Sequence, residues 1–318
     1  MNAKQVRLTL TICSTLAILP ALYAHQSPSE NGEPVRMIVT AEPNKGADVP
    51  AVNAADVTVD EAKERDQVAA WIPAQGDHAA LEFFVLIDDS SRDVLATQFA
   101  DIKNFIAEQP PTTKIGIAYM QNGIARIEQS LTADHDQAIK AIRLPLGYFG
   151  ANASPYFSLS DLVKKWPQDT ARHEVLMITN GFDPYYGPYH GMGDMLDPYL
   201  DAVIEDSQRA GVVVSAIYEP SAGHIGHSYW LSYWGQIYLA KLTQETGGEA
   251  YYIGFYGQAP DFTPFLKDLS DRLNHQYILR LIPKPQKRDG MQPVKLKTEL
   301  HNVDLVAASR VYVPATPK

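Results

Sequence analysis

The sequence predicts an α/β protein with a doubly wound, mainly parallel sheet and a small accessory β unit built from both ends of the chain. Two observations predict this class. Between residues 81 and 273, nearly continuous apolar runs alternate with segments of helical periodicity, a pattern typical of strands covered by helices on both faces. After residue 277 the apolar period changes to two, which is typical of half-exposed antiparallel strands.

The overall composition excludes several classes of protein. The chain has 318 residues, of which 45% are apolar, so it can bury a substantial core. Lys and Arg number 27 against 37 Asp and Glu, and the resulting net charge of −10 argues against a nucleic-acid partner. The single cysteine, Cys13, excludes an intrachain disulfide and any metal site built from cysteines.

The N-terminal residues have the pattern of an export signal. Lys4 and Arg7 precede an apolar stretch, residues 8–22, that contains no acidic residue, and cleavage is expected after Ala24. The stretch is short and interrupted for a membrane span of about 20 apolar residues. We therefore expect a signal peptide at 1–24, a flexible leader at 25–34, and a secreted or periplasmic mature protein without a membrane span.

The remaining elements follow in chain order. The N-terminal β segment, residues 35–78, is expected to hold strands at 35–40, 55–59 and 67–72. The α/β domain, residues 79–276, is expected to hold strands at 81–87, 115–120, 124–127, 174–179, 211–218 and 250–253, and helices at 94–106, 134–142, 156–166, 195–210, 237–246 and 262–273. The C-terminal segment, residues 277–314, is expected to pack on the N-terminal segment with strands at 277–282, 294–300 and 305–313.

Polar residues follow two of the buried strands directly. Residues 88–93 (DDSSRD) follow the strand at 81–87, and residues 180–183 (NGFD) follow the strand at 174–179. Ligands of open α/β sheets bind outside the carboxyl ends of the strands, so these segments are the candidate site. A carboxylate followed by hydroxyls at alternate positions offers the hard oxygen ligands that Mg²⁺ prefers.

These segments resemble a known family. Asp88-x-Ser90, the loop at Ser154 before a helix, and Thr179-Asn180-Gly181 resemble the metal-ion-dependent adhesion site of von Willebrand factor type A domains. The tail, with YILRLIP at 277–283 and ASRVY at 308–312, is similar to exported von Willebrand A-related proteins known mainly from Acidobacteria. The resemblance covers residues 35–314. It implies a binding function and makes Asp88, Ser90 and Ser154 candidate ligands of Mg²⁺.

The segments also depart from the family's pattern, so the adhesion site is expected to be degenerate. Arg92 stands where the family has a second serine, and Asn180 stands where it has an aspartate; both changes weaken a cation site. Three arrangements remain open. In the first, Mg²⁺ binds as the resemblance implies. In the second, the site shifts so that Asp89, Ser91 and Asp93 point inward, or Asp183 takes the place of Asn180. In the third, Asp88 caps the next helix and pairs with Arg92.

Aromatic residues are concentrated in two segments, 181–193 and 219–236, that are expected to be loops at the same end of the sheet. Tyrosine and tryptophan provide large, rigid contact surfaces with a polar tip, which is typical of recognition sites. The alternative is that the rings pack on one another to cover the sheet end. The candidate binding residues among them are Tyr185, Tyr186, Tyr189, Trp230, Tyr233 and Trp234.

We expect a non-catalytic binding or adhesion protein whose partner is a protein or an extracellular polymer. The face would be formed by the aromatic residues together with Asp88, Ser90, Arg92, Ser154, Asn180 and Asp183, with Arg92 able to take an acidic group of the partner. Two alternatives are a secreted metal-dependent hydrolase using Asp183, His190 or His224, and a ligand-free structural component of the envelope. His224-x-x-His227 lacks the H-E-x-x-H helix of hydrolytic zinc sites, and no G-x-S-x-G motif occurs.

Overall fold

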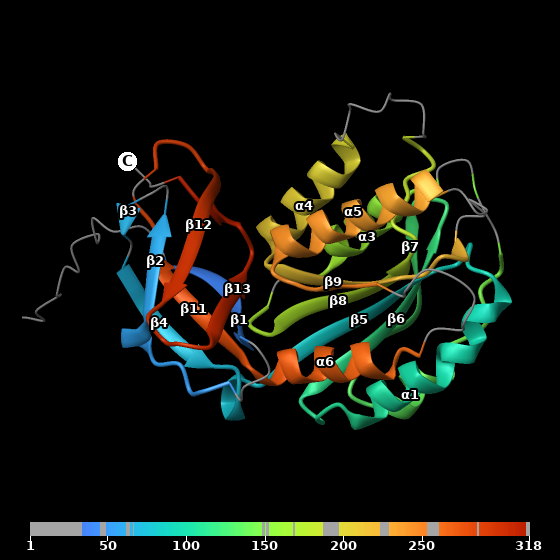
Figure 1. Ribbon diagram of the computed structural model, residues 1–318, viewed down its shortest axis with the longest axis horizontal. Coiled ribbons are helices and arrows are strands. Elements are labelled where there is room, and N and C mark those ends of the chain that lie inside the picture. The colour runs from blue at the N-terminus through green and yellow to red at the C-terminus, as the bar shows by residue number, and fades with distance from the viewer. Residues whose placement is uncertain are drawn as a thin grey trace, which may run out of the picture. The chain divides into compact units, whose positions relative to one another are not determined.

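The computed structural model describes residues 34–44, 49–61, 64–65, 67–147, 150, 153–167, 169–186, 197–222, 229–252, 261–284 and 286–315 (Figure 1). These residues belong to one compact unit, 31–318. The expected export signal and nearly all of the expected leader lie outside the described residues. Within the described ranges, every helix is too short or too polar to cross a membrane.

A six-stranded sheet forms the centre of the α/β domain, with the strand order β10-β9-β8-β5-β6-β7. Neighbouring strands are parallel, except that β6 and β7 form an antiparallel hairpin at one edge. The mainly parallel sheet predicted from the sequence is confirmed. The strands are β5 (Leu81–Asp88), β6 (Thr113–Gln121), β7 (Ile124–Thr132), β8 (Arg172–Thr179), β9 (Val212–Tyr218) and β10 (Ala250–Tyr251).

Helices cover both faces of this sheet (Figure 1). Successive side chains of a strand point to opposite faces, so Phe83 and Val85 of β5 join one apolar core while Phe84 and Leu86 join the other. The first core is completed by α1 (Phe99–Glu108), α2 (His135–Lys140) and α6 (Thr263–Asn274), and the second by α3 (Pro155–Lys165), α4 (Pro198–Ala210) and α5 (Tyr229–Thr246). β5 therefore lies at the centre, with β8 and β6 on either side of it.

The starts of two helices differ from the sequence prediction. The helix expected at 94–106 begins as a 3₁₀ turn, Asp93–Gln98, before α1. The second, α5, starts at Tyr229, so the segment 229–236 is helical rather than a loop. Its aromatic residues recur at positions i and i+4, namely Tyr229 with Tyr233 and Trp230 with Trp234, which is helical spacing. The prediction placed these residues in a loop because the segment follows a strand and is rich in aromatic residues.

The accessory β unit contains two four-stranded sheets, ordered β13-β1-β11-β4 and β14-β12-β2-β3, whose paired strands run antiparallel. Val39, Val59 and Leu279 contribute to the apolar core that the sheets share. Strands from both ends of the chain build the unit, as predicted. They are β1 (Val35–Pro43), β2 (Val57–Glu61), β3 (Glu64–Arg65), β4 (Gln67–Pro73), β11 (Gln276–Ile282), β12 (Gly290–Thr298), β13 (Val303–Ala307) and β14 (Arg310–Val313).

The strand expected at 305–313 is instead two strands, β13 and β14. The break occurs where the backbone meets the end of α5: Ala308 forms an isolated bridge with Thr246, and the Ser309 amide donates to the Glu245 carbonyl at 3.1 Å. The chain then leaves the first sheet and enters the second. This contact joins residues more than 60 positions apart in the chain, so no local sequence pattern predicts the break between the two strands.

Candidate functional site

A small pocket that is open to solvent lies at the carboxyl ends of β5 and β8. Its lining includes Asp88, Ser90, Ser154 and Asn180, four residues that the sequence analysis assigned to one site. They come from the segment after β5, the start of α3 and the segment after β8. The parallel arrangement of the strands brings these separate segments together. The other lining residues are Met120, Asn122, Gly123, Ala153, Pro155, Ser158, Phe182 and Pro184.

Asp88 is the acidic residue that lines this pocket, and its carboxylate is buried. Its Oδ1 accepts hydrogen bonds from the backbone amide and hydroxyl of Ser90, at 3.0 and 2.5 Å, and its Oδ2 accepts one from the Thr179 hydroxyl at 2.7 Å. Burial raises the pKa of Asp88, and these hydrogen bonds only partly oppose the shift. Within the described part of the chain, Asp88 forms no ion pair with a Lys, Arg or His. The charged form of this carboxyl group is therefore destabilised by burial and has no cationic side chain among the described residues to compensate it.

Two further buried carboxylates lie in the neighbouring segments. The Ser154 hydroxyl donates to Asp183 Oδ2 at 2.8 Å, and the Tyr185 amide donates to Asp183 Oδ1 at 2.8 Å. Burial raises the pKa of Asp183 to about 6, while the hydrogen bond from Ser154 opposes the shift. Glu219, which follows β9, also has its pKa raised by burial and, to a smaller extent, by the negative charge of Asp88. Three buried carboxyl groups, Asp88, Asp183 and Glu219, therefore lie at or just after the ends of the strands at this end of the sheet.

Asn180 does not replace a metal-binding aspartate in this arrangement. Its amide nitrogen donates to the Ala222 carbonyl at 2.6 Å, and its amide oxygen accepts from the Phe182 backbone amide at 2.9 Å. Both polar atoms of the side chain therefore bond the backbone of the segments that follow β8 and β9. The residue lines the pocket and fixes its wall.

The shifted arrangement, with Asp89 pointing inward, is not adopted. Asp89 is fully buried and accepts hydrogen bonds from Arg143 Nη1 and Nη2, at 2.7 and 3.2 Å, and from the Leu146 amide at 2.9 Å. Although burial raises it, the pKa of Asp89 is held below its ordinary value by the hydrogen bonds from Arg143 and Gln121. Arg143 comes from the segment after α2, and no local pattern in the sequence links it to Asp89.

Arg92 lies apart from the lining of the pocket. Its side chain is exposed, and its backbone amide donates to the Ser221 hydroxyl at 3.1 Å. The ion pair between Asp88 and Arg92 that the metal-free interpretation required is not present among the residues that the structure describes. The hydroxyl groups of Ser90 and Thr179, rather than a guanidinium, contact the Asp88 carboxylate.

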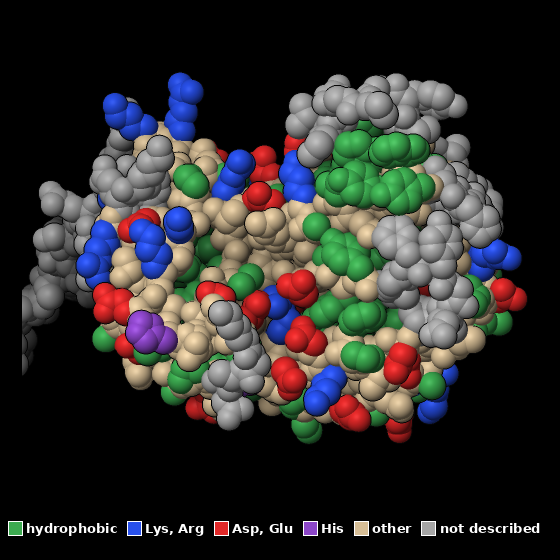
Figure 2. Space-filling model, in the orientation of Figure 1, with side chains coloured by type: hydrophobic (Ala, Val, Ile, Leu, Met, Phe, Trp, Pro, Cys, Tyr) green, Lys and Arg blue, Asp and Glu red, His purple; other side chains and the backbone are tan. Residues whose placement is uncertain are grey.

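The first turns of α5 expose Tyr229, Trp230 and Tyr233, and we call these three residues the α5 aromatic face. Their exposed fractions are 53%, 58% and 43%, and the rings of Tyr229 and Tyr233 stack with centroids 6.3 Å apart. Figure 2 shows hydrophobic side chains gathered over α5 and its surroundings. Trp234, the next aromatic residue of the helix, is half-buried and packs against Tyr238. It supports the helix rather than extending the exposed face.

In the other aromatic segment, 181–193, Tyr185 and Tyr186 pack against aromatic rings of α3 and α4. Tyr185 contacts the rings of Phe157 and Tyr199 at centroid distances of 5.0 and 5.5 Å, and Tyr186 contacts Tyr199 at 6.3 Å. This is the ring packing that the sequence analysis offered as the alternative to recognition, although Tyr185 remains 46% exposed. The predicted residues Tyr189, His190, His224 and His227 lie outside the described residues.

Close backbone packing places α5 directly against the wall of the pocket. A Cβ added at Gly235 would lie 2.0 Å from the Asn180 carbonyl oxygen. Gly181 has a φ of +68°, and a Cβ added there would lie 2.4 Å from the Gly235 carbonyl oxygen. The two glycines therefore let the helix carrying the α5 aromatic face touch the segment that carries Asn180.

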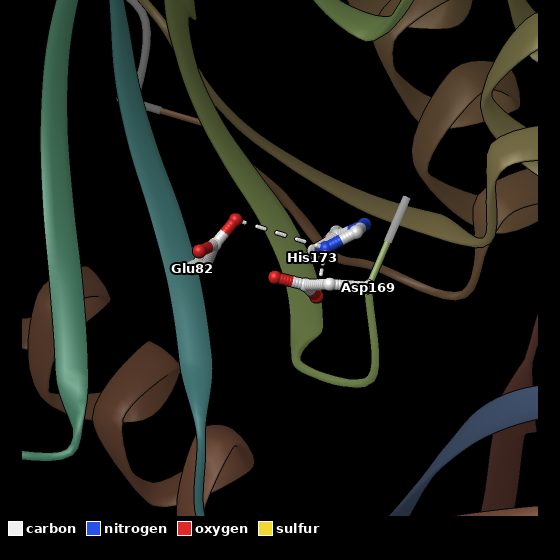
Figure 3. Close-up of side chains that lie close together, drawn as sticks. All are labelled: Glu82, Asp169 and His173. Atoms are coloured by element: carbon white, nitrogen blue, oxygen red, sulfur yellow. Dashed lines mark hydrogen bonds and ion pairs between the residues drawn. The ribbon is translucent and has the colours of Figure 1, made fainter. Parts of the chain in front are cut away.

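A second cluster of titratable side chains lies at the opposite end of the same strands. Glu82 of β5, His173 of β8 and Asp169 of the connection before β8 point toward one another (Figure 3). No pattern in the sequence predicted this cluster. Glu82 and Asp169 are 87 positions apart in the chain and meet only because β5 and β8 pair in register, Glu82 beside His173.

Comparisons with known proteins found similar solved structures, all at low sequence identity. No known family profile matches the sequence, and no protein of curated function matches it. Similar solved structures include an aerotolerance-related membrane protein from Bacteroides fragilis, with 14% identity, 61% of this chain and 99% of the other covered, and a TM-score of 0.43. The SpRpn10 VWA domain has 16% identity, coverage of 60% and 94%, and a TM-score of 0.37. Manganese-loaded TRAP protein from Plasmodium vivax has 10% identity, coverage of 90% and 100%, and a TM-score of 0.40.

At these identities and TM-scores the matches say nothing about the ligand or the activity of this chain. The assignment of the fold depends on the order of the central strands, on the single antiparallel edge strand, and on the helices that cover both faces. The α/β part of the chain therefore has a fold of the von Willebrand factor type A kind, joined to an accessory β unit.

Proposed function

We propose that the protein is an exported, non-catalytic binding protein that engages a protein or an extracellular polymer at the carboxyl end of its central sheet. One observation supports this most strongly. A pocket containing a buried carboxylate without a cationic partner, Asp88, lies beside a helix that exposes three aromatic rings. A polar pocket next to exposed Tyr and Trp side chains is the composition of a recognition surface.

The side chains around Asp88 fit a hard divalent cation. Asp88, Ser90, Thr179 and Ser154 provide only oxygen atoms, which are the ligands that Mg²⁺ and Mn²⁺ prefer. Such a cation would supply the positive charge that the buried carboxylate lacks and would attract an acidic group of a partner. Asn180 would shape the wall of the pocket, and the exposed Arg92 would lie outside it.

Removing the Asp88 charge is expected to weaken cation binding. Calorimetric titration of the metal-stripped protein with Mg²⁺ and with Mn²⁺ should give at least a tenfold weaker affinity for Asp88→Asn than for the wild type. Asp93→Asn, which changes an exposed carboxylate five positions along the chain, is the matched control and should bind as the wild type does. Equal affinities in all three proteins would contradict the role of Asp88.

Removing the aromatic rings is expected to weaken partner binding without unfolding the protein. Trp230→Ala combined with Tyr233→Ala should reduce binding at least tenfold on arrays of envelope proteins and extracellular polysaccharides, because exposed rings contribute contact area but little core packing. Ile127→Ala, at an exposed apolar residue of β7, is the control. A ligand that binds all variants equally would refute the surface, and turnover of ester, peptide or glycoside substrates would favour a hydrolase.

A further inference from the structure

The cluster of Glu82, Asp169 and His173 lies far from the pocket. Glu82 is the second residue of β5, whereas Asp88 is the last, so at about 3.3 Å per residue the two are about 20 Å apart along the strand. His173 is the second residue of β8, and Asp169 lies in the connection between α3 and β8. Nothing in the proposed function uses these three side chains (Figure 3).

The donor atoms of the cluster have the spacing of metal ligands. His173 Nε2 lies 3.0 Å from Asp169 Oδ1 and 3.8 Å from Glu82 Oε2, and all three donor atoms lie within 4.8 Å of one another. Tetrahedral Zn²⁺, with ligand bonds of about 2.0–2.1 Å, separates its ligand atoms by about 3.3 Å. The two observed distances lie on either side of this value, so small side-chain rotations would bring the donors to coordinating positions.

Neighbouring groups hold the three donors in place, as supporting groups do around metal ligands. Trp166 Nε1 donates to Glu82 Oε2 at 2.9 Å, and its ring stacks on His173 with centroids 5.0 Å apart. The Ala171 amide donates to Asp169 Oδ1 at 2.8 Å. Each donor therefore already has a fixed orientation, which lowers the entropy cost of binding an ion.

Charge and access also suit a cation. Glu82 and His173 are buried, but the Asp169 side chain is 41% exposed, which gives an ion a route from solvent. Lys114 Nζ contacts Glu82 Oε1 at 3.0 Å, the oxygen that does not face His173 Nε2 in the 3.8 Å contact. Because its side chain is 53% exposed, Lys114 can turn toward solvent when an ion binds.

We propose that Glu82, Asp169 and His173 form a binding site for a divalent transition metal of the Zn²⁺ type. One imidazole nitrogen and two carboxylates favour Zn²⁺ over Mg²⁺, which prefers oxygen ligands alone. A bound ion would join β5, β8 and the connection before β8 at the amino ends of the strands. Its role would be to stabilise this end of the sheet, independently of the Asp88 pocket.

The test uses the tag-free mature chain, stripped of metal and titrated with ZnCl₂ by calorimetry. We expect His173→Gln and Asp169→Asn each to weaken Zn²⁺ affinity at least tenfold relative to the wild type. The control is His78→Gln, which changes an exposed histidine outside the cluster and should bind as the wild type does. Asp169→Asn is included because His173 is buried and its replacement can disturb the core, whereas the exposed Asp169 side chain can be changed without this effect.

A second measurement distinguishes this site from the Asp88 pocket. Zn²⁺ should raise the melting temperature of the wild type and of Asp88→Asn equally, and should not raise that of Asp169→Asn. Titration with Co²⁺ should give the visible absorption of a four-coordinate ion only when His173 is present. A wild type that binds no Zn²⁺, or cluster variants that bind it with unchanged affinity, would overturn the proposal.

Discussion

Replacement of Arg143 by methionine is expected to lower the free energy of unfolding by about 3 kcal/mol, because it leaves the fully buried Asp89 carboxylate without its cation. The Arg143 side chain is 28% exposed and donates two hydrogen bonds to Asp89, and its guanidinium lies 3.8 Å from the centre of the Tyr119 ring. The variant therefore loses an ion pair and ring packing together. Urea unfolding at neutral pH measures the change.

Two further variants separate charge from packing. Adding Asp89→Asn to Arg143→Met removes the buried charge and should restore stability to within about 1 kcal/mol of the wild type. Arg126→Met is the matched control, since the Arg126 side chain is 63% exposed in its pair with Glu128 and should change stability by less than about 0.5 kcal/mol. A double variant no more stable than Arg143→Met would show that packing, not charge, dominates.

Replacement of Gly235 by alanine is expected to destabilise the protein by about 3 kcal/mol, at the upper end of the usual cost of overpacking. Inside a helix the same change normally stabilises by about 1 kcal/mol, because alanine has the higher helix propensity. Here the new methyl group would lie 2.0 Å from the Asn180 carbonyl oxygen. That oxygen belongs to the backbone, so the segment after β8 has to move. Thermal or urea unfolding shows whether the substitution lowers or raises the free energy of unfolding.

The control for this prediction is Gly290→Ala, at a glycine with no other heavy atom within 4 Å of the added Cβ. It should change the free energy of unfolding by less than about 0.5 kcal/mol. Gly235→Ala should also alter cation binding at the Asp88 pocket, because Asn180 lines that pocket. If Gly235→Ala stabilises the protein, the close contact between α5 and the pocket wall does not exist.

The sequence predicted the central sheet well because its signal is local. All eight residues of β5 and all eight of β8 are buried, and each strand contains an apolar run, at 83–87 and 175–178, that is visible in the sequence. The start of α5 was mispredicted because the aromatic segment 219–236 was assigned as a whole to a loop after the strand at 211–218. In the structure Gly235 is required by the contact with Asn180, a residue 55 positions earlier.

The candidate site was predicted in its position but not in its internal contacts. Asp88, Ser90, Ser154 and Asn180 could be placed at one pocket because the ends of parallel strands meet. Which atom bonds which could not be predicted. The pairing of Asp89 with Arg143, 54 positions later, depends on how the segment after α2 folds back, and no periodic pattern encodes that.

The position of β1 has a consequence for the order of folding. This first strand pairs with β11 on one side and with β13 on the other, both from the last part of the chain. During synthesis, β1 leaves the ribosome early, but the two strands that pair with it, β11 and β13, are made near the end. The accessory unit can therefore form only after the whole α/β core has left the ribosome.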